Sequence, residues 1–199
     1  MANVYIITCF FYTAGWKLPR GSVEKDLFGM LSVTPDPVYV YTDLHPGDEI
    51  LTRFPKRVKY FHVTNGTGYL SLLPKCESCV FYYSGHSVKM YSQGYSLGMI
   101  MPDGKPLDVK RLFALWKTAH LIYDSCYSGT VLDILPDTWS CITSCGNKER
   151  SGFGLSGSAF TSKFLEACKS GTAVSGSIRG GKQTIHIKGD FPLGFNGKP

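Results

Sequence analysis

Short apolar segments of strand length alternate with segments of helical spacing along this chain of 199 residues. The first, Val4–Phe11, is a nearly continuous apolar run, which is typical of a strand buried on both faces of a sheet. Further strands are expected at Pro37–Tyr41, Val58–Val63, Ser78–Tyr83, Ala119–Tyr123, Trp139–Thr143 and Gln183–Lys188. Helices are expected at Val23–Leu31, Leu107–Trp116 and Ala159–Cys168. This order predicts an α/β domain with a mainly parallel sheet.

Composition and charge limit the partners and the compartment that we expect for this chain. A hydrophobic fraction of 43% supports a sizeable core, and we expect one domain over residues 1–199 with no prodomain. The formal charge of +6 is spread along the chain, so we expect no nucleic-acid partner. No run is long enough to span a bilayer, so no membrane association is expected. Seven cysteines in apolar segments favour free thiols in a reducing, cytoplasmic compartment.

Two polar motifs follow two of the predicted strands directly. Tyr83-Ser84-Gly85-His86-Ser87 follows one, and Asp124-Ser125-Cys126-Tyr127-Ser128-Gly129 follows another. Ligands bind beyond the carboxyl ends of strands in parallel sheets, so neighbouring strands would bring the imidazole and the thiol together. An imidazole can take the proton of a thiol nucleophile and return it to a leaving amine. The pair predicts thiol catalysis, although a lone cysteine or histidine after a strand is more often structural.

At these motifs the sequence resembles the caspase-like cysteine peptidases, most closely the metacaspase branch. That branch shows a Tyr-Ser-Gly-His-Gly loop followed by an Asp-Ser-Cys-His-Ser-Gly loop, in the same order. Weaker likeness extends over most of the chain, at Leu18–Asp26, Ile142–Ser151, Gly157–Thr161, Gln183–Thr184 and Phe191–Leu193.

The resemblance implies a caspase-like three-layer sandwich, with a central, mostly parallel sheet of about six strands and helices on both faces. It also implies hydrolysis of peptide bonds in a peptide or protein substrate through an acyl-enzyme. Cys126 would be the nucleophile and His86 the general base and acid. The backbone N–H groups of Ser87 and Cys126 would form the oxyanion hole.

Metacaspases cleave after Arg or Lys, and the resemblance assigns an acidic first substrate pocket. Asp124 and Ser84 match two of its residues, and a second carboxylate falls at Asp26 or, with a shift of one residue, at Lys25. A carboxylate there would neutralise a cationic side chain in a partly desolvated slot. Arg20 stands where a caspase pocket arginine would fall, which would instead favour an acidic substrate residue. We expect cleavage after a basic residue.

No cofactor is expected. Many metacaspases require calcium, but Asp103, Asp108 and Asp124 are the only carboxylates from His86 to Cys126, too few for a calcium cage. The cysteine pairs Cys76/Cys79 and Cys141/Cys145 could ligate zinc. The second pair, however, lies inside a strand-like run, and the predicted sheet places another strand between the two pairs, so we expect no metal. The resemblance favours a monomer.

Two departures keep a different class of function open. The motif glycine after the histidine is Ser87, and the histidine of the second loop is Tyr127. A chain altered at these positions could be a catalytically silent module that docks on another caspase-like protein.

Overall fold

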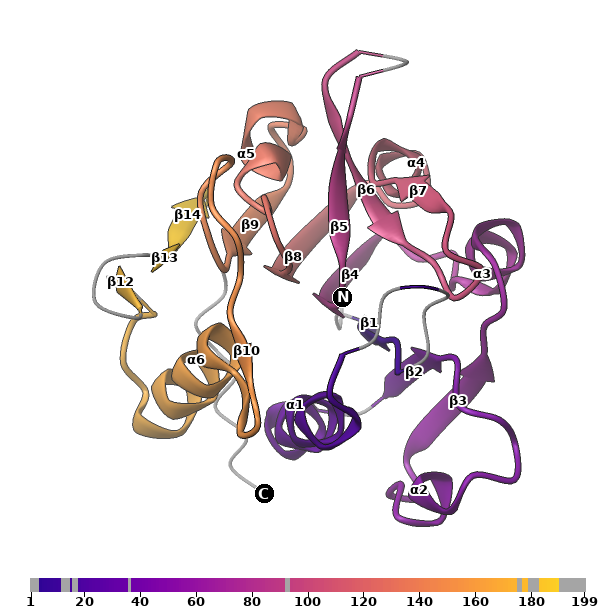
Figure 1. Cartoon of the computed structure of the whole chain (residues 1–199). Coiled ribbons are helices and arrows are strands. Elements are labelled where there is room, and N and C mark those ends of the chain that lie inside the picture. The colour runs from indigo at the N-terminus through magenta and orange to yellow at the C-terminus, as the bar shows by residue number, and fades with distance from the viewer. Residues whose placement is uncertain are drawn as a thin grey trace.

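The computed structural model describes residues 4–11, 15, 18–35, 37–91, 94–174, 177–178 and 183–189 (Figure 1). The expected segment Phe191–Leu193 lies outside the described residues.

A central sheet of seven strands organises the molecule, in the order β14-β9-β8-β4-β1-β2-β3. Neighbours from β3 to β9 run parallel, and β14 is antiparallel to β9. The α/β sandwich with a mostly parallel sheet is therefore confirmed, with seven strands instead of about six. The strands are β1 (Val4–Cys9), β2 (Val38–Thr42), β3 (Val58–His62), β4 (Ser78–Ser84), β8 (Thr118–Asp124), β9 (Ser140–Thr143) and β14 (His186–Lys188).

Two long helices cover one face of the sheet, α1 (Arg20–Val33) and α6 (Ala159–Ser170), and Figure 1 shows them side by side. Their apolar residues pack on alternate sheet residues, which include Ile7, Val40 and Ile122. The alternation follows from the strand period of two, which sends every second side chain to the same face.

Short elements cover the other face. They are α3 (Gly66–Leu72), α4 (Lys110–Phe113), α5 (Thr130–Ile134) and a small antiparallel sheet of β5 (Ser87–Met90), β6 (Ser96–Ile100) and β7 (Pro106–Asp108). Tyr69, Leu97 and Leu112 from these elements pack on the sheet residues that point to this side. The remaining elements are α2 (Glu49–Thr52), β10 (Phe153–Gly154), β11 (Gly157–Ser158), β12 (Ser177–Ile178) and β13 (Gln183–Thr184).

Two sequence-based boundaries were wrong. The helix expected over Leu107–Trp116 is instead β7 followed by the four-residue helix α4. The buried Leu107 lies in a strand that pairs with β6, because tertiary pairing overrides a helical spacing that short segments imitate. The strand expected over Gln183–Lys188 is divided into β13 and β14, which belong to different sheets.

The strand order places the expected site at a topological switch point. From β1 the chain proceeds to β2 and β3 on one side, and then returns to β4, β8 and β9 on the other side. Crevices in open α/β sheets form outside the carboxyl ends of the strands where the order reverses. β4 ends at this point and β8 lies beside it, so the two polar motifs leave the sheet next to one another.

None of the helices in the described part of the chain is both long and apolar enough to traverse a lipid bilayer. All seven cysteines are free thiols, and Cys9, Cys79, Cys141 and Cys145 are buried.

Candidate active site

The two motifs leave neighbouring strands at the same level. In the parallel pairing of β4 with β8, Ser84 lies opposite Asp124 at the last residue of each strand. Beyond the strands, the N–H of Gly85 donates to the carbonyl of Asp124 over 3.2 Å, which extends the contact into the loops. His86 and Cys126 each stand two residues past the strand end.

A set of short-range contacts fixes the His86 loop. The Tyr83 hydroxyl donates to the carbonyl oxygen of His86 over 2.6 Å, and the N–H of Ile100 donates to the same oxygen over 2.9 Å. A Cβ on Gly85 would lie 2.6 Å from the Tyr83 hydroxyl oxygen, so only glycine fits beneath this bond. The Tyr-Ser-Gly-His pattern therefore has a packing reason as well as a chemical one.

Cys126 lies in a sharp turn between β8 and α5. Tyr127, the residue after it, has a φ of 60°, a left-handed backbone conformation that residues other than glycine rarely adopt. Its N–H donates to the carbonyl of Glu149 over 2.9 Å, and its own carbonyl accepts from the N–H of Thr130 over 2.9 Å. The turn leaves Cys126 half-buried at the end of the strand.

The side chain of Ser87 bridges the two loops. Its hydroxyl donates to the hydroxyl of Ser125 over 2.6 Å, and both residues are buried. The bond joins the residue after His86 to the residue before Cys126. The Ser87 side chain thus points toward Ser125 and is buried.

Strand pairing sets the direction of the Ser87 N–H. The Ile100 N–H donates to the His86 carbonyl, so His86–Ile100 occupies a hydrogen-bonding position of the antiparallel pair. These positions alternate, and the next pair, Ser87–Met99, is therefore a non-hydrogen-bonded one. The Ser87 N–H therefore points away from β6.

Burial acts on both members of the expected dyad. It lowers the pKa of the His86 imidazole. It raises the pKa of the Cys126 thiol, while the N–H of Ser151 and the charge of Arg150 act in the opposite direction. Both shifts favour the uncharged form, which is a thiol for Cys126 and a neutral imidazole for His86.

The two expected pocket carboxylates lie in one buried cluster. Asp124 is fully buried, and its two oxygens accept hydrogen bonds from the hydroxyls of Ser151 at 2.8 Å and Thr161 at 2.7 Å. Both oxygens of Asp26 accept from the N–H of Ser158 at 3.1 Å. Burial raises the pKa of both carboxyls, and the charge of Asp124 adds to burial in raising the pKa of Asp26 to about 8.

The structure also places Lys25, Ser84 and Arg20, which the resemblance related to the substrate pocket. Asp26 is 2% exposed. Lys25 is exposed, and its amine donates to the carbonyl of Leu155 over 3.2 Å. Of these two residues, Asp26 is therefore the one whose side chain faces inward. Ser84 is fully buried, and its hydroxyl has no hydrogen-bond partner among the residues described. The exposed Arg20 donates to both oxygens of Asp48, at 2.8 and 3.0 Å.

A loop that follows β9 supports the nucleophile turn. The Ser144 hydroxyl accepts from the N–H of Ser125 over 3.2 Å, and the N–H of Gly129 donates to the carbonyl of Cys145 over 2.8 Å. The buried amide of Gln183 donates to the Ser144 carbonyl over 2.8 Å and accepts from the N–H of Gly152 over 3.1 Å. The loop after β9 thus holds the Cys126 turn, and the Gln183 amide in turn holds that loop.

Sequence reasoning did not find the hydroxyl groups of this site. Ser125, Ser144, Ser151, Ser158 and Thr161 supply the bonds that hold the loops and satisfy Asp124. The one available signal was the density of serine and threonine directly after predicted strands and at a helix start. The inward direction of Asp26 could have been found, since it falls three residues after Val23 and four before Met30 on the buried stripe of α1.

Comparisons with known proteins bear on the fold. No family model matches the chain, and no curated protein matches it. The crystal structure of protein GSU0716 from Geobacter sulfurreducens is similar, with a TM-score of 0.58 and 17% identity over 94% of this chain and 93% of that one. At this identity the likeness shows a shared fold.

Within the described residues, no group of three or more His, Cys, Asp or Glu side chains is arranged to hold a metal ion. Cys79 lies on β4 and Cys141 on β9, and β8 separates these two strands. The expected separation of the two cysteine pairs is therefore confirmed.

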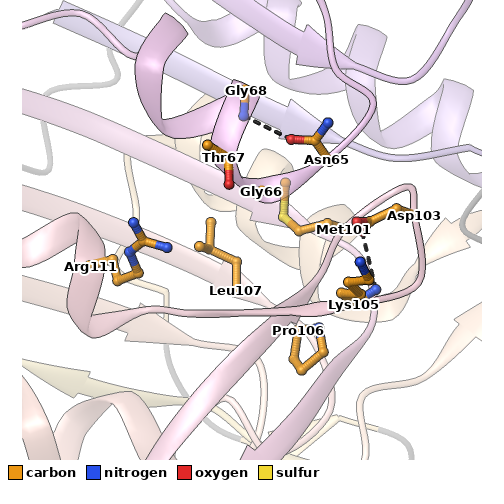
Figure 2. Close-up of a pocket in the computed structure, with 10 residues that line it drawn as sticks. All are labelled: Asn65, Gly66, Thr67, Gly68, Met101, Asp103, Lys105, Pro106, Leu107 and Arg111. Atoms are coloured by element: carbon orange, nitrogen blue, oxygen red, sulfur yellow. Dashed lines mark hydrogen bonds between the residues drawn. The ribbon is translucent and has the colours of Figure 1, made fainter.

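A hollow of about 640 Å³ lies apart from the dyad, between residues 65–68 before and within α3 and residues 101–111 around β7 (Figure 2). Figure 2 shows Arg111 and Lys105 at its two ends, with Leu107 and Met101 between them. Met101 directly follows Ile100, which bonds the His86 carbonyl, so the hollow is joined to the His86 loop through β6.

Proposed function

We propose that the protein is a caspase-like cysteine endopeptidase, close to the metacaspases, that hydrolyses peptide bonds with His86 and Cys126. The observation that carries the proposal is the pairing of the two loops. They leave adjacent parallel strands at Ser84 and Asp124, and the Ser87–Ser125 hydrogen bond of 2.6 Å joins the residues next to the dyad.

The residues of the site have the chemistry for an acyl-enzyme pathway. The imidazole of His86 takes the thiol proton while the sulfur of Cys126 bonds to the scissile carbonyl carbon. The imidazolium then protonates the leaving amine, and the C–N bond breaks to leave a thioester. His86 next takes a proton from water, whose oxygen attacks the thioester, and the C–S bond breaks to release the acid and restore the thiol.

Backbone donors would stabilise the charged oxygen of each tetrahedral intermediate. The N–H of Ser87 faces away from β6, and the N–H of Cys126 belongs to the same turn as the sulfur. Fixed N–H donors of this kind contribute about 3–4 kcal/mol each to transition-state stability in related chemistry. Because the Ser87 hydroxyl is turned toward Ser125, serine can replace the motif glycine without filling the space for the oxyanion.

We further propose cleavage after Arg or Lys. Asp26 and Asp124 place two carboxyl groups in one buried cluster, and the adjacent Ser84 hydroxyl can bond a cationic head group. A bound cation would favour the ionised form of Asp26, against the burial and the Asp124 charge that raise its pKa. The seven free thiols support a reducing, cytoplasmic environment, and the resemblance supports a monomer.

Hydrolysis of fluorogenic peptides that end in Arg, Lys or Asp tests the proposal. We expect the wild type to release fluorophore from the Arg and Lys peptides, and the Cys126→Ala and His86→Ala variants to lose this signal. The Cys168→Ala variant is a matched control, because that half-buried thiol lies on α6 and outside both loops.

A peptidyl acyloxymethyl ketone separates the peptidase from a silent docking module. Selective labelling of Cys126 over the other six thiols indicates an activated nucleophile. Equal labelling of Cys126 and Cys168, together with no hydrolysis above the Cys126→Ala background, would leave the docking module as the better account.

A further inference from the structure

Tyr127 joins two cationic side chains that come from different parts of the chain. The amine of Lys89, on β5, lies 5.3 Å from the centroid of the Tyr127 ring. The Nε–H of Arg150 donates to the Tyr127 hydroxyl over 3.2 Å. The Tyr127 N–H also donates to the carbonyl of Glu149, so the segment that carries Arg150 is fixed beside the nucleophile turn.

Neither cation is neutralised by a carboxylate within the part of the chain that the structure describes, where the ion pairs are Arg20–Asp48 and Arg53–Glu24. Two nearby carboxylates, Glu149 next to Arg150 in sequence and Asp133 on α5, already accept hydrogen bonds. Glu149 accepts from the N–H groups of Gly146 and Thr184, and Asp133 accepts from the Asn147 amide. Two positive charges therefore remain available to a ligand next to the nucleophile.

The geometry of Arg150 suits a carboxylate. Its Nε is occupied by Tyr127, which orients the guanidinium plane and leaves its two terminal nitrogens as donors. An oriented guanidinium binds carboxylates through paired N–H donors. The charge of Arg150 also lowers the pKa of the Cys126 thiol, which places this guanidinium within electrostatic reach of the sulfur.

We propose that Lys89 and Arg150, held by Tyr127, bind an acidic side chain of the substrate beside the scissile bond. This inference rests on the proposed peptidase function and adds a second specificity element to it. The enzyme would select a basic residue before the scissile bond together with an acidic residue close to it.

Matched peptide pairs test the proposal. Each pair has Arg before the scissile bond and differs only by Glu or Gln at P2, P1′ or P2′. We expect the wild type to cleave the Glu member of at least one pair about tenfold faster by kcat/KM. The ratio should fall to near one in the Lys89→Gln/Arg150→Gln double variant, and Arg150→Glu should reverse it toward a Lys-containing peptide.

The Glu/Gln ratio within each variant cancels any general loss of activity. Lys148→Gln is the matched control, because it removes one positive charge from the same loop. The Lys148 side chain lines a separate hollow with Asp133 and His186, so this variant should keep the wild-type Glu/Gln ratio. Cleavage of all peptides with ratios near one, or a preference that persists in the double variant, overturns this inference alone. If no peptide is cleaved above the Cys126→Ala background, the peptidase proposal fails and the inference falls with it.

Discussion

The hydroxyl of Ser87 donates to the hydroxyl of Ser125 over 2.6 Å, and this buried bond ties the residue after His86 to the residue before Cys126. It is a direct side-chain link between the two loops of the proposed dyad. The relative position of the two loops therefore depends on a hydroxyl contact that is separate from the imidazole and the sulfur.

Replacement of Ser87 by alanine tests this link. Ser87→Ala leaves the buried Ser125 hydroxyl without its donor, which should lower the free energy of unfolding by about 1–2 kcal/mol. We expect kcat/KM to fall about tenfold, because small displacements of reacting groups are costly. Urea unfolding and peptide hydrolysis measure the two effects.

Ser32→Ala is the control for that substitution, since the exposed Ser32 hydroxyl bonds only within its own helix, to the carbonyl of Gly29. It should change neither quantity. A Ser87→Ala enzyme with unchanged kcat/KM would show that the link does not position the dyad.

As the pH is lowered, kcat/KM should fall with a midpoint below pH 6.5; this fall is the acid limb of the pH profile. Burial lowers the pKa of His86 from 6.5, so the neutral imidazole that acts as base persists to a lower pH than for an exposed histidine. The pH profile of kcat/KM for an Arg peptide measures the limb. Burial also lowers the pKa of His120, so His120→Gln is the control and should leave the acid limb unchanged. An acid limb above pH 6.5 would contradict the role of His86 as the base.

Stability should fall as pH rises from about 4 to about 8. The folded-state pKa of Asp26 is about 8 against an ordinary value of 3.8, so in this window the folded protein holds a proton that the unfolded chain has released. The folded state therefore loses up to about 1.4 kcal/mol per pH unit from this group. Asp26→Asn should flatten this slope in urea unfolding measured at several pH values.

The control for the pH dependence is Asp103→Asn, at an exposed carboxylate in the turn before β7. This variant should retain the wild-type slope. A slope that is the same in wild type and Asp26→Asn would show that Asp26 is not the group responsible.

Gly129 should not tolerate a side chain. A Cβ at this position would lie 2.6 Å from the backbone nitrogen of Asn147 and 2.7 Å from the carbonyl carbon of Gly146, and backbone cannot move aside cheaply. We expect Gly129→Ala to lower the free energy of unfolding by about 1–3 kcal/mol. Gly154→Ala, where nothing lies within 4 Å, should cost less than half as much, and equal losses would contradict the packing argument.

The helix α1 shows how far periodicity carries a prediction. Val23, Leu27 and Met30 mark its buried stripe, and the same stripe contains Asp26 but not Lys25. The helical spacing alone therefore predicts that Asp26, and not Lys25, faces inward. What the spacing could not supply was the partner, because Asp26 meets the N–H of Ser158, which lies 132 positions away in the chain.

The sequence by itself determined the strands of the parallel sheet and the two motifs at their ends, because strand burial and turn chemistry are local properties of the chain. It failed at Leu107, where pairing with β6 decided between strand and helix. Only the tertiary structure decided that β4 and β8 are neighbours, with Ser84 opposite Asp124 and Ser87 bonded to Ser125. These contacts depend on strand order and register, which arise when distant segments bury their apolar faces together, and no local pattern encodes them.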